Sequence, residues 1–114
     1  MTQTHFIKLN EKFCSAVLSG DKNFEIRKND RGYQKGDFIR FVPIADDGTH
    51  MYHPVSAEEY LITYVLNGYG LRDEYCVFGI KKSRTVPQII GEDIGRGMTD
   101  AKGGEGVKLD WVAE

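Results

Sequence analysis

The sequence predicts an α+β fold: a small mixed β-barrel with one N-terminal helix packed on it and an extended C-terminal tail. Several short segments alternate apolar and polar residues, one early segment has helical periodicity, and strands and helices do not alternate along the chain. The 114 residues, 40% of them hydrophobic, suffice for a single core. We therefore expect a barrel domain in residues 1–82 and a glycine-rich tail in residues 83–114.

The predicted helix covers residues 11–18. It follows a short apolar run at residues 5–9 and begins after Asn10, whose side chain can cap it, and Gly20 supplies its end. Its apolar side chains form one broad stripe that should pack on the sheet, namely Phe13, Cys14, Ala16, Val17 and Leu18.

Period-two patterns bounded by turn residues predict four strands, at residues 24–27, 38–44, 58–66 and 75–81. The last of them should close the barrel. Residues 49–54 are expected to be irregular or a weak edge strand because they end in a proline. In the third strand, one face should carry four apolar side chains, Tyr60, Ile62, Tyr64 and Leu66.

The stretch of residues 20–31 contains seven charged residues, yet its centre, Phe24-Glu25-Ile26-Arg27, has the pattern of a strand. Successive side chains leave a strand on opposite faces, so Phe24 and Ile26 should enter the core while Glu25 and Arg27 pair on the outer surface. Such a pair is either the ordinary solvated face of an edge strand or a fixed set of donors and acceptors for a phosphate-bearing or base-like ligand.

A helix ending in glycine, then Gly20-Asp21-Lys22-Asn23-Phe24-Glu25-Ile26-Arg27 and a Gly36-Asp37 strand start, resembles the signature of ASCH domains, which belong to the PUA-like superfamily. The resemblance covers residues 5–80. With the Asn29-Asp30-Arg31 extension, the chain resembles a domain of unknown function common in phage and prophage genomes (DUF3850-like). The resemblance implies a pocket between the helix and the barrel and a role in binding RNA or a nucleotide-like ligand.

The resemblance assigns Lys22, Glu25 and Arg27 to that pocket. Lys22 would supply an ammonium, Arg27 a planar fork for phosphate or a base edge, and Glu25 an acceptor for an exocyclic amine. Gly68 would let the backbone approach a ligand or would serve only a tight turn, and Tyr69 could stack on a base. The remaining candidate ligand-binding residues are Lys28, Asn29 and Arg31.

One branch of the ASCH family resembles small amidohydrolases that remove the acetyl group from N4-acetylcytidine. There, the signature lysine and a threonine three residues later are implied to act with a distant glutamate. Here the third residue after Lys22 is Glu25, which lacks the hydroxyl that acyl transfer would use, and only Asp73 or Glu74 could replace the distant acid. We expect binding rather than catalysis, with an amidohydrolase using Lys22 and Glu25 as the alternative.

The composition of the chain argues against several other classes of function. The formal net charge of −2 argues against a protein that coats nucleic acid non-specifically. No apolar run approaches the roughly 18 residues of a membrane span, and Cys14 and Cys76 indicate reduced core thiols in a cytoplasmic protein. His5, His50 and His53 fall short of a ligand set, so we expect no metal and no cofactor.

The tail suggests a third function, a phage-borne protein that binds and inhibits a host protein, with residues 83–114 receiving the partner or a second copy of the chain. Val86, Ile89 and Ile90 should anchor the tail on the barrel. Residues 109–112, the Leu-Asp-Trp-Val end, would then reach the partner.

Overall fold

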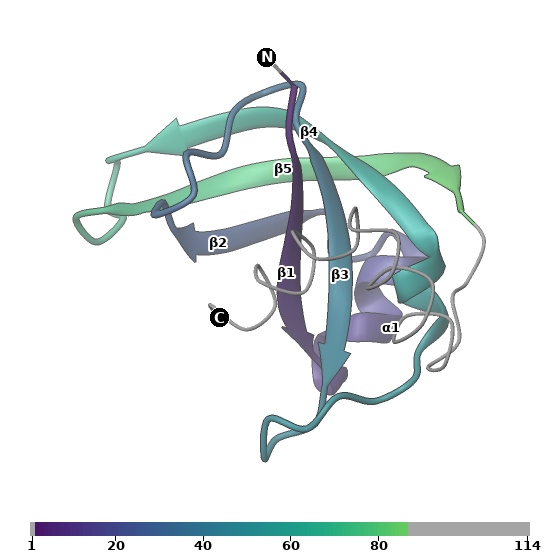
Figure 1. The fold of residues 1–114 in the computed structure, drawn as a ribbon. Coiled ribbons are helices and arrows are strands. Elements are labelled where there is room, and N and C mark those ends of the chain that lie inside the picture. Colours follow the sequence, from purple (N-terminus) through teal and green to yellow (C-terminus); the bar gives the residue numbers. More distant parts are fainter. Residues whose placement is uncertain (1, 87–114) are drawn as a thin grey trace, which may run out of the picture.

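The computed structural model describes residues 2–86, in which five strands form one mixed sheet that curls into a half-barrel (Figure 1). Along the sheet the strand order is β1-β3-β4-β5-β2, with β1 and β3 parallel and the other neighbours antiparallel. This confirms the predicted α+β, barrel-like class with one early α-helix. The elements are β1 (Thr4–Asn10), α1 (Glu11–Ser19), β2 (Phe24–Lys28), β3 (Phe38–Ile44), the 3-10 helix η1 (Pro54–Ala57), β4 (Glu58–Asn67) and β5 (Tyr75–Thr85).

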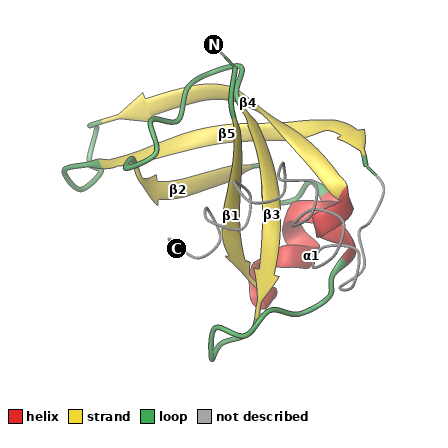
Figure 2. Cartoon of the chain, in the orientation of Figure 1, coloured by secondary structure: helices red, strands yellow, loops and turns green. Residues whose placement is uncertain are grey.

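The sheet curls because a short connection joins its two edges. β1 and β2 are the edge strands, and the chain passes from one to the other through α1, whose nine residues span about 14 Å. Figure 2 shows β1 and β3 crossing β2 and β5 at a steep angle, with α1 at the lower end of β1 and β3. Within residues 2–86 no backbone ladder joins β1 to β2, so the predicted closure of the barrel is replaced by an open seam.

Both ends of α1 follow the sequence signals. Asn10 Oδ1 accepts a hydrogen bond from the Lys12 N–H at 3.0 Å, and Gly20, at φ 91°, donates its N–H to the Val17 carbonyl. The apolar stripe is narrower than predicted, because Cys14 and Val17 are buried while Phe13 is 39% exposed. The ring of Phe13 is therefore available at the surface beside the seam.

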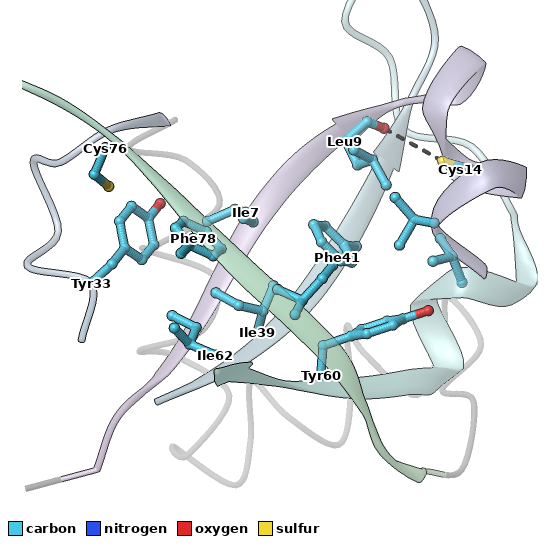
Figure 3. Packing of buried hydrophobic residues seen from close by; sticks show 13 residues of the cluster. Ile7, Leu9, Cys14, Tyr33, Ile39, Phe41, Tyr60, Ile62, Cys76 and Phe78 are labelled. Atoms are coloured by element: carbon cyan, nitrogen blue, oxygen red, sulfur yellow. Dashed lines mark hydrogen bonds between the residues drawn. The ribbon is translucent and has the colours of Figure 1, made fainter. Parts of the chain in front are cut away.

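Inward side chains from β1, β3, β4 and β5 form one hydrophobic core (Figure 3). Aromatic pairs help to fill it, with the rings of Phe41 and Tyr60 packed edge to face at 5.4 Å. Cys14 and Cys76 are free and buried, which confirms the prediction of reduced core thiols. Burial raises the pKa of the Cys14 thiol to about 11, so it stays protonated at neutral pH and is a poor nucleophile.

The two faces of β2 are the reverse of the prediction. Phe24 and Ile26 are 41% and 53% exposed, whereas Glu25 is 3% exposed and Arg27 is half-buried. The alternating pattern correctly identifies which residues share a face. It cannot identify which face turns inward, because that depends on the partners that meet the carboxylate at the seam.

The prediction of a single apolar face on β4 is wrong beyond Ile62. Tyr60 and Ile62 are buried, but a register shift between Ile62 and Tyr64 leaves Tyr64 63% exposed. One extra residue in a strand exchanges the faces of everything that follows. Gly79, opposite the irregularity, accommodates it: a Cβ there would lie 2.6 Å from Thr63 Oγ1.

The last strand is longer than predicted. β5 extends to Thr85 instead of ending at residue 81, and the next N–H, of Val86, donates to the Ala57 carbonyl at 2.7 Å. Val86, the first predicted tail anchor, is buried. The other predicted anchors, Ile89 and Ile90, and residues 91–114 lie outside the described residues. None of the helices in residues 2–86 is long and apolar enough to cross a membrane.

A buried carboxylate fastens the end of the barrel opposite α1. Asp37, 2% exposed, lies 2.9 Å from His5 Nε2 and accepts hydrogen bonds from the N–H groups of Gln3 and Gln34. The His5 ring packs against the ring of Tyr33 at 4.8 Å. Asp37 thus connects the start of β1 with the start of β3 and the loop before it.

Replacing Asp37 with alanine should destabilise the protein by roughly 3 kcal/mol, because the buried His5 ring and two part-buried backbone N–H groups lose their acceptor. Urea unfolding would measure the change. Asp47→Ala is the matched control, since Asp47 bonds only to Thr49 at the surface and should have little effect. Equal unfolding midpoints for the two variants would contradict the structural role of Asp37.

Candidate ligand-binding site

The side chains of Lys22, Glu25 and Arg27 converge on one point at the seam. Lys22 Nζ lies 2.5 Å from Glu25 Oε2 and donates to the Phe24 carbonyl at 2.8 Å. Arg27 donates through Nε to Glu25 Oε1 at 2.9 Å, and through Nη2 to the Lys8 carbonyl at 2.7 Å. The three predicted residues therefore form one cluster, and Arg27 carries it across from β2 to β1.

Local structure sets these positions. Glu25 and Arg27 are two residues apart in β2, so both side chains leave the same face. Lys22 follows the left-handed turn at Gly20, and its N–H donates to the Ala16 carbonyl at 3.0 Å, which fixes the chain as it leaves α1. The end of the helix thus brings the ammonium to the edge of β2.

The cluster compensates a deeply buried charge. The Glu25 side chain is 4% exposed, whereas those of Lys22 and Arg27 are 19% and 22% exposed. A carboxylate withdrawn from water is costly unless cations and hydrogen bonds satisfy it, and here both oxygens are satisfied. The three side chains together carry one net positive charge. The side chains of Lys22 and Arg27 reach solvent, whereas that of Glu25 does not.

Two phenylalanine rings flank the ammonium. Lys22 Nζ lies 5.2 Å from the ring centre of Phe13 and 5.0 Å from that of Phe24, and both rings are about two-fifths exposed. Together with the seam they enclose a cleft of about 450 Å³. Its lining residues are Lys8, Leu9, Asn10, Phe13, Lys22, Phe24, Glu25, Ile26 and Arg27.

Backbone groups of β2 also face this cleft. The Asn23 carbonyl accepts from the Ile80 N–H at 2.9 Å, so it points toward β5. Because consecutive residues of an antiparallel strand direct their backbone groups to alternate sides, Phe24 and Ile26 direct theirs toward the seam. The bond from Lys22 to the Phe24 carbonyl agrees with this orientation. The cleft therefore has amide as well as charged hydrogen-bonding groups.

The other predicted ligand-binding residues lie elsewhere. Lys28 is at the far end of β2, where its Nζ lies 3.6 Å from a Glu74 carboxylate oxygen. It lines a second cavity, of about 540 Å³, with Asn29 and Gly68. That cavity also contains Asp30, Asp73, Glu74 and Arg72, and this mixture of charges gives it no preference for an anion.

The local surroundings of three more of the predicted ligand-binding residues are defined by the fold. Asn29 Oδ1 accepts from the Tyr33 N–H at 2.9 Å, so its amide orders the loop after β2. Tyr69 is 90% exposed at φ 55°, next to Gly68 at φ 75°, which supports the tight-turn interpretation of this segment. Arg31 is half-buried and close enough to Tyr33 to act on the pKa of its hydroxyl, which burial raises to about 12.

The histidines are dispersed. His5 is paired with Asp37, and His53 caps η1 by accepting from the Val55 N–H through Nδ1. His50 is exposed and forms an isolated antiparallel bridge with Ile44, the only strand-like contact in residues 49–54. Among residues 2–86, no group of three or more histidine, cysteine or acidic side chains is arranged to hold a metal ion.

Sequence reasoning missed three parts of the cleft: the ring of Phe13, the carbonyl of Lys8, and the ring of Phe24, which was expected in the core. Phe13 directly precedes Cys14 in the helix, so a narrow stripe centred on Cys14 and Val17 would have left it at the edge. The Lys8 carbonyl has no signal in the sequence, because backbone groups become acceptors only through the arrangement of the two edge strands.

A small half-barrel with a charged seam cleft is thus the class that the structure defines. The chain belongs to the family described as "Domain of unknown function (DUF3850)", whose model matches residues 4–80 and so contains the whole cleft. It is also similar to the "Uncharacterized 12.9 kDa protein in GpA 3'region" of Escherichia phage P2, with 46% identity over 39 residues. That similarity covers 34% of this chain and 36% of the phage protein, about a third of each.

The buried position of Glu25 predicts a strong coupling with Arg27. In a double-mutant cycle of Glu25→Gln and Arg27→Met, urea unfolding should give a coupling energy of about 1–2 kcal/mol. The matched cycle of Lys28→Met and Glu74→Gln tests an exposed ion pair at the far end of β2, where screening should limit the coupling to about 0.5 kcal/mol or less. Similar couplings in the two cycles would show that the seam cluster is no tighter than a surface ion pair.

Proposed function

We propose that this protein binds RNA or a nucleotide-like ligand in the cleft at the β1–β2 seam, and that its half-barrel is of the ASCH, PUA-like type. One observation carries the proposal: a buried carboxylate is held between two cations, directly beside two exposed phenylalanine rings. An ion pair on the protein surface would need neither a buried carboxylate nor neighbouring aromatic rings. A ligand with a base and a phosphate would contact the rings, the two cations and the carboxylate.

The chemistry of the cleft matches such a ligand. The ammonium of Lys22 and the guanidinium of Arg27 suit phosphate or base oxygens, and Glu25 can accept from an exocyclic amine. The rings of Phe13 and Phe24 offer faces on which an unstacked base can lie. A volume of about 450 Å³ is within the range typical of small-molecule sites.

The distribution of charge supports a local nucleic-acid contact. Twelve of the 15 basic residues but only 11 of the 17 acidic residues lie in residues 1–86, so this part carries a formal charge of +1. The negative net charge of the chain comes from residues 87–114. A half-barrel with this small excess favours contact with a few phosphates over coating of long nucleic acids.

Binding accounts for the cleft better than hydrolysis does. Both oxygens of Glu25 already accept hydrogen bonds from cations, which favours a fixed acceptor over a general base. The two cysteine thiols are buried with raised pKa values, so neither offers a thiolate nucleophile. The amidohydrolase using Lys22 and Glu25 is therefore the less favoured proposal.

The comparisons favour a phage or prophage setting for this activity. Free buried thiols suit the reducing cytoplasm of a bacterium, where we propose that the protein acts. Inhibition of a host protein through the tail remains a separate hypothesis, because residues 87–114 lie outside the described part of the chain.

Lys22→Met should weaken binding of cytidine 5′-monophosphate roughly tenfold or more, because a charge-assisted hydrogen bond to the ligand is lost. Isothermal titration calorimetry on the full chain would measure it. Lys12→Met is the matched control: Lys12 Nζ also lies close to the Phe13 ring, at 5.3 Å, but Lys12 does not line the cleft. If the two variants bind the nucleotide equally well, or if the wild type binds neither this nucleotide nor RNA, the proposed function is wrong.

A second test separates binding from catalysis. We expect little or no release of acetate from N4-acetylcytidine, because Glu25 stands where the amidohydrolases would have a hydroxyl nucleophile. An enzymatic acetate assay would measure release, with Lys22→Met as the control. Rapid turnover that the substitution abolishes would establish the amidohydrolase instead.

A further inference from the structure

The outer face of β4, β5 and β2 is an apolar surface whose composition follows from the strand register. Phe24 and Tyr64 both pair with Gly79, and Ile26 and Leu66 both pair with Val77. Residues directly opposite each other in a sheet share a face. The outer face therefore contains two rows across three strands, continued by Tyr75, and we call it the outer patch: Phe24, Ile26, Tyr64, Leu66, Tyr75 and Val77.

Three members of the outer patch are well exposed. Phe24, Ile26 and Tyr64 are 41%, 53% and 63% exposed, and the other members are half-buried. Within residues 2–86 the helix α1 contacts β1, β3 and η1, so it packs away from this face. Contiguous apolar surface of this kind on a small protein commonly marks a binding site.

Cationic side chains lie along the border of the outer patch, and at the Tyr75 end acidic side chains lie among them. Lys28 pairs with Tyr75 at one end, and Lys81 pairs with Leu61 at the other, both at outward positions of the sheet. Lys22 Nζ lies 5.0 Å from the ring centre of Phe24, and the Arg72 guanidinium lies 5.8 Å from that of Tyr75. No acidic side chain stands at an outward position of β2, of β4 from Leu61 to Leu66, or of β5 from Tyr75 to Lys81. Glu74, at the margin of the patch, approaches Lys28.

We infer that the outer patch is a stacking platform for single-stranded RNA that extends from the seam cleft, an inference that rests on the proposed function. Phe24 belongs to both surfaces, because it lines the cleft and also stands in the first row of the patch. Phe24 and Tyr64 are two strands apart, about 10 Å, so separate bases can lie on their rings. The bordering lysines then meet the phosphates between those bases.

The same charges argue against a second copy of the chain as the occupant. If two outer patches met face to face with their strands parallel, Lys81 of one copy would lie against Lys81 of the other. Like charges brought together at a desolvated interface are unfavourable. A polyanion with unstacked bases satisfies both the aromatic centre and the cationic border.

Tyr64→Ala is the central test, with fluorescence anisotropy of a 5′-labelled 12-nucleotide single-stranded RNA of mixed sequence and the full chain. Loss of one stacking ring should weaken binding roughly five- to a hundredfold, whereas Tyr64→Phe should bind like the wild type. Tyr52→Ala is the matched control, since Tyr52 is 70% exposed but lies in the segment between β3 and η1. With about three phosphates contacted, the logarithm of the binding constant should fall with the logarithm of salt concentration with a slope of about −2.

Cytidine 5′-monophosphate, titrated in parallel, separates this inference from the proposed function. Its binding should be the same in the wild type and in Tyr64→Ala, because Tyr64 is not part of the cleft. If the mononucleotide binds but Tyr64→Ala leaves 12-mer binding unchanged, the platform is wrong and the cleft stands. If the wild type binds neither probe, both proposals are wrong. A wild-type dimer in analytical ultracentrifugation that Tyr64→Ala dissociates would assign the outer patch to a second copy and overturn the inference.

Discussion

The Glu25 carboxylate, held between Lys22 and Arg27, is the interaction on which the arrangement of the barrel seam depends. It lies where three segments meet: the chain leaving α1, the edge strand β2 and the edge strand β1. Arg27 binds the carboxylate with one part of its guanidinium and the Lys8 carbonyl with another. A side chain thus bridges the two edges where no backbone ladder joins them.

This bridge explains how the half-barrel keeps two edge strands without exposing them fully. Edge carbonyls invite pairing with other chains unless charges or covering segments satisfy them. Lys22 donates a hydrogen bond to the Phe24 carbonyl of β2, and Arg27 donates one to the Lys8 carbonyl of β1. The same two cations fix the carboxylate between them, so protection of the edges and organisation of the cleft come from one set of hydrogen bonds.

Local signals in the sequence were sufficient for α1, for four of the five strands and for the membership of the cluster, but not for η1. Asn10 and Gly20 mark the two ends of the helix, and the spacing of Lys22, Glu25 and Arg27 places them together. Two features could not be predicted: which face of β2 turns inward, and the exchange of inward and outward faces after Ile62 in β4. Both depend on residues distant in the chain. Glu25 turns inward where Lys22 and Arg27 meet its carboxylate, and the Lys8 carbonyl holds Arg27 there. The irregularity in β4 fits because Gly79 lacks a side chain.

The inward turn of the charged face of β2 is also a physical argument for the proposed function. Burying Glu25 withdraws three charged groups partly or wholly from water, and replacing such clusters with apolar side chains is often neutral or stabilising. Exposing Phe24 and Ile26 on the other face forgoes the burial of two large apolar side chains. Apolar burial alone would favour the opposite orientation, whereas the observed one gains the bridge across the seam. Departures of this kind from the folding optimum are characteristic of binding surfaces, and here they coincide on the two faces of one five-residue strand.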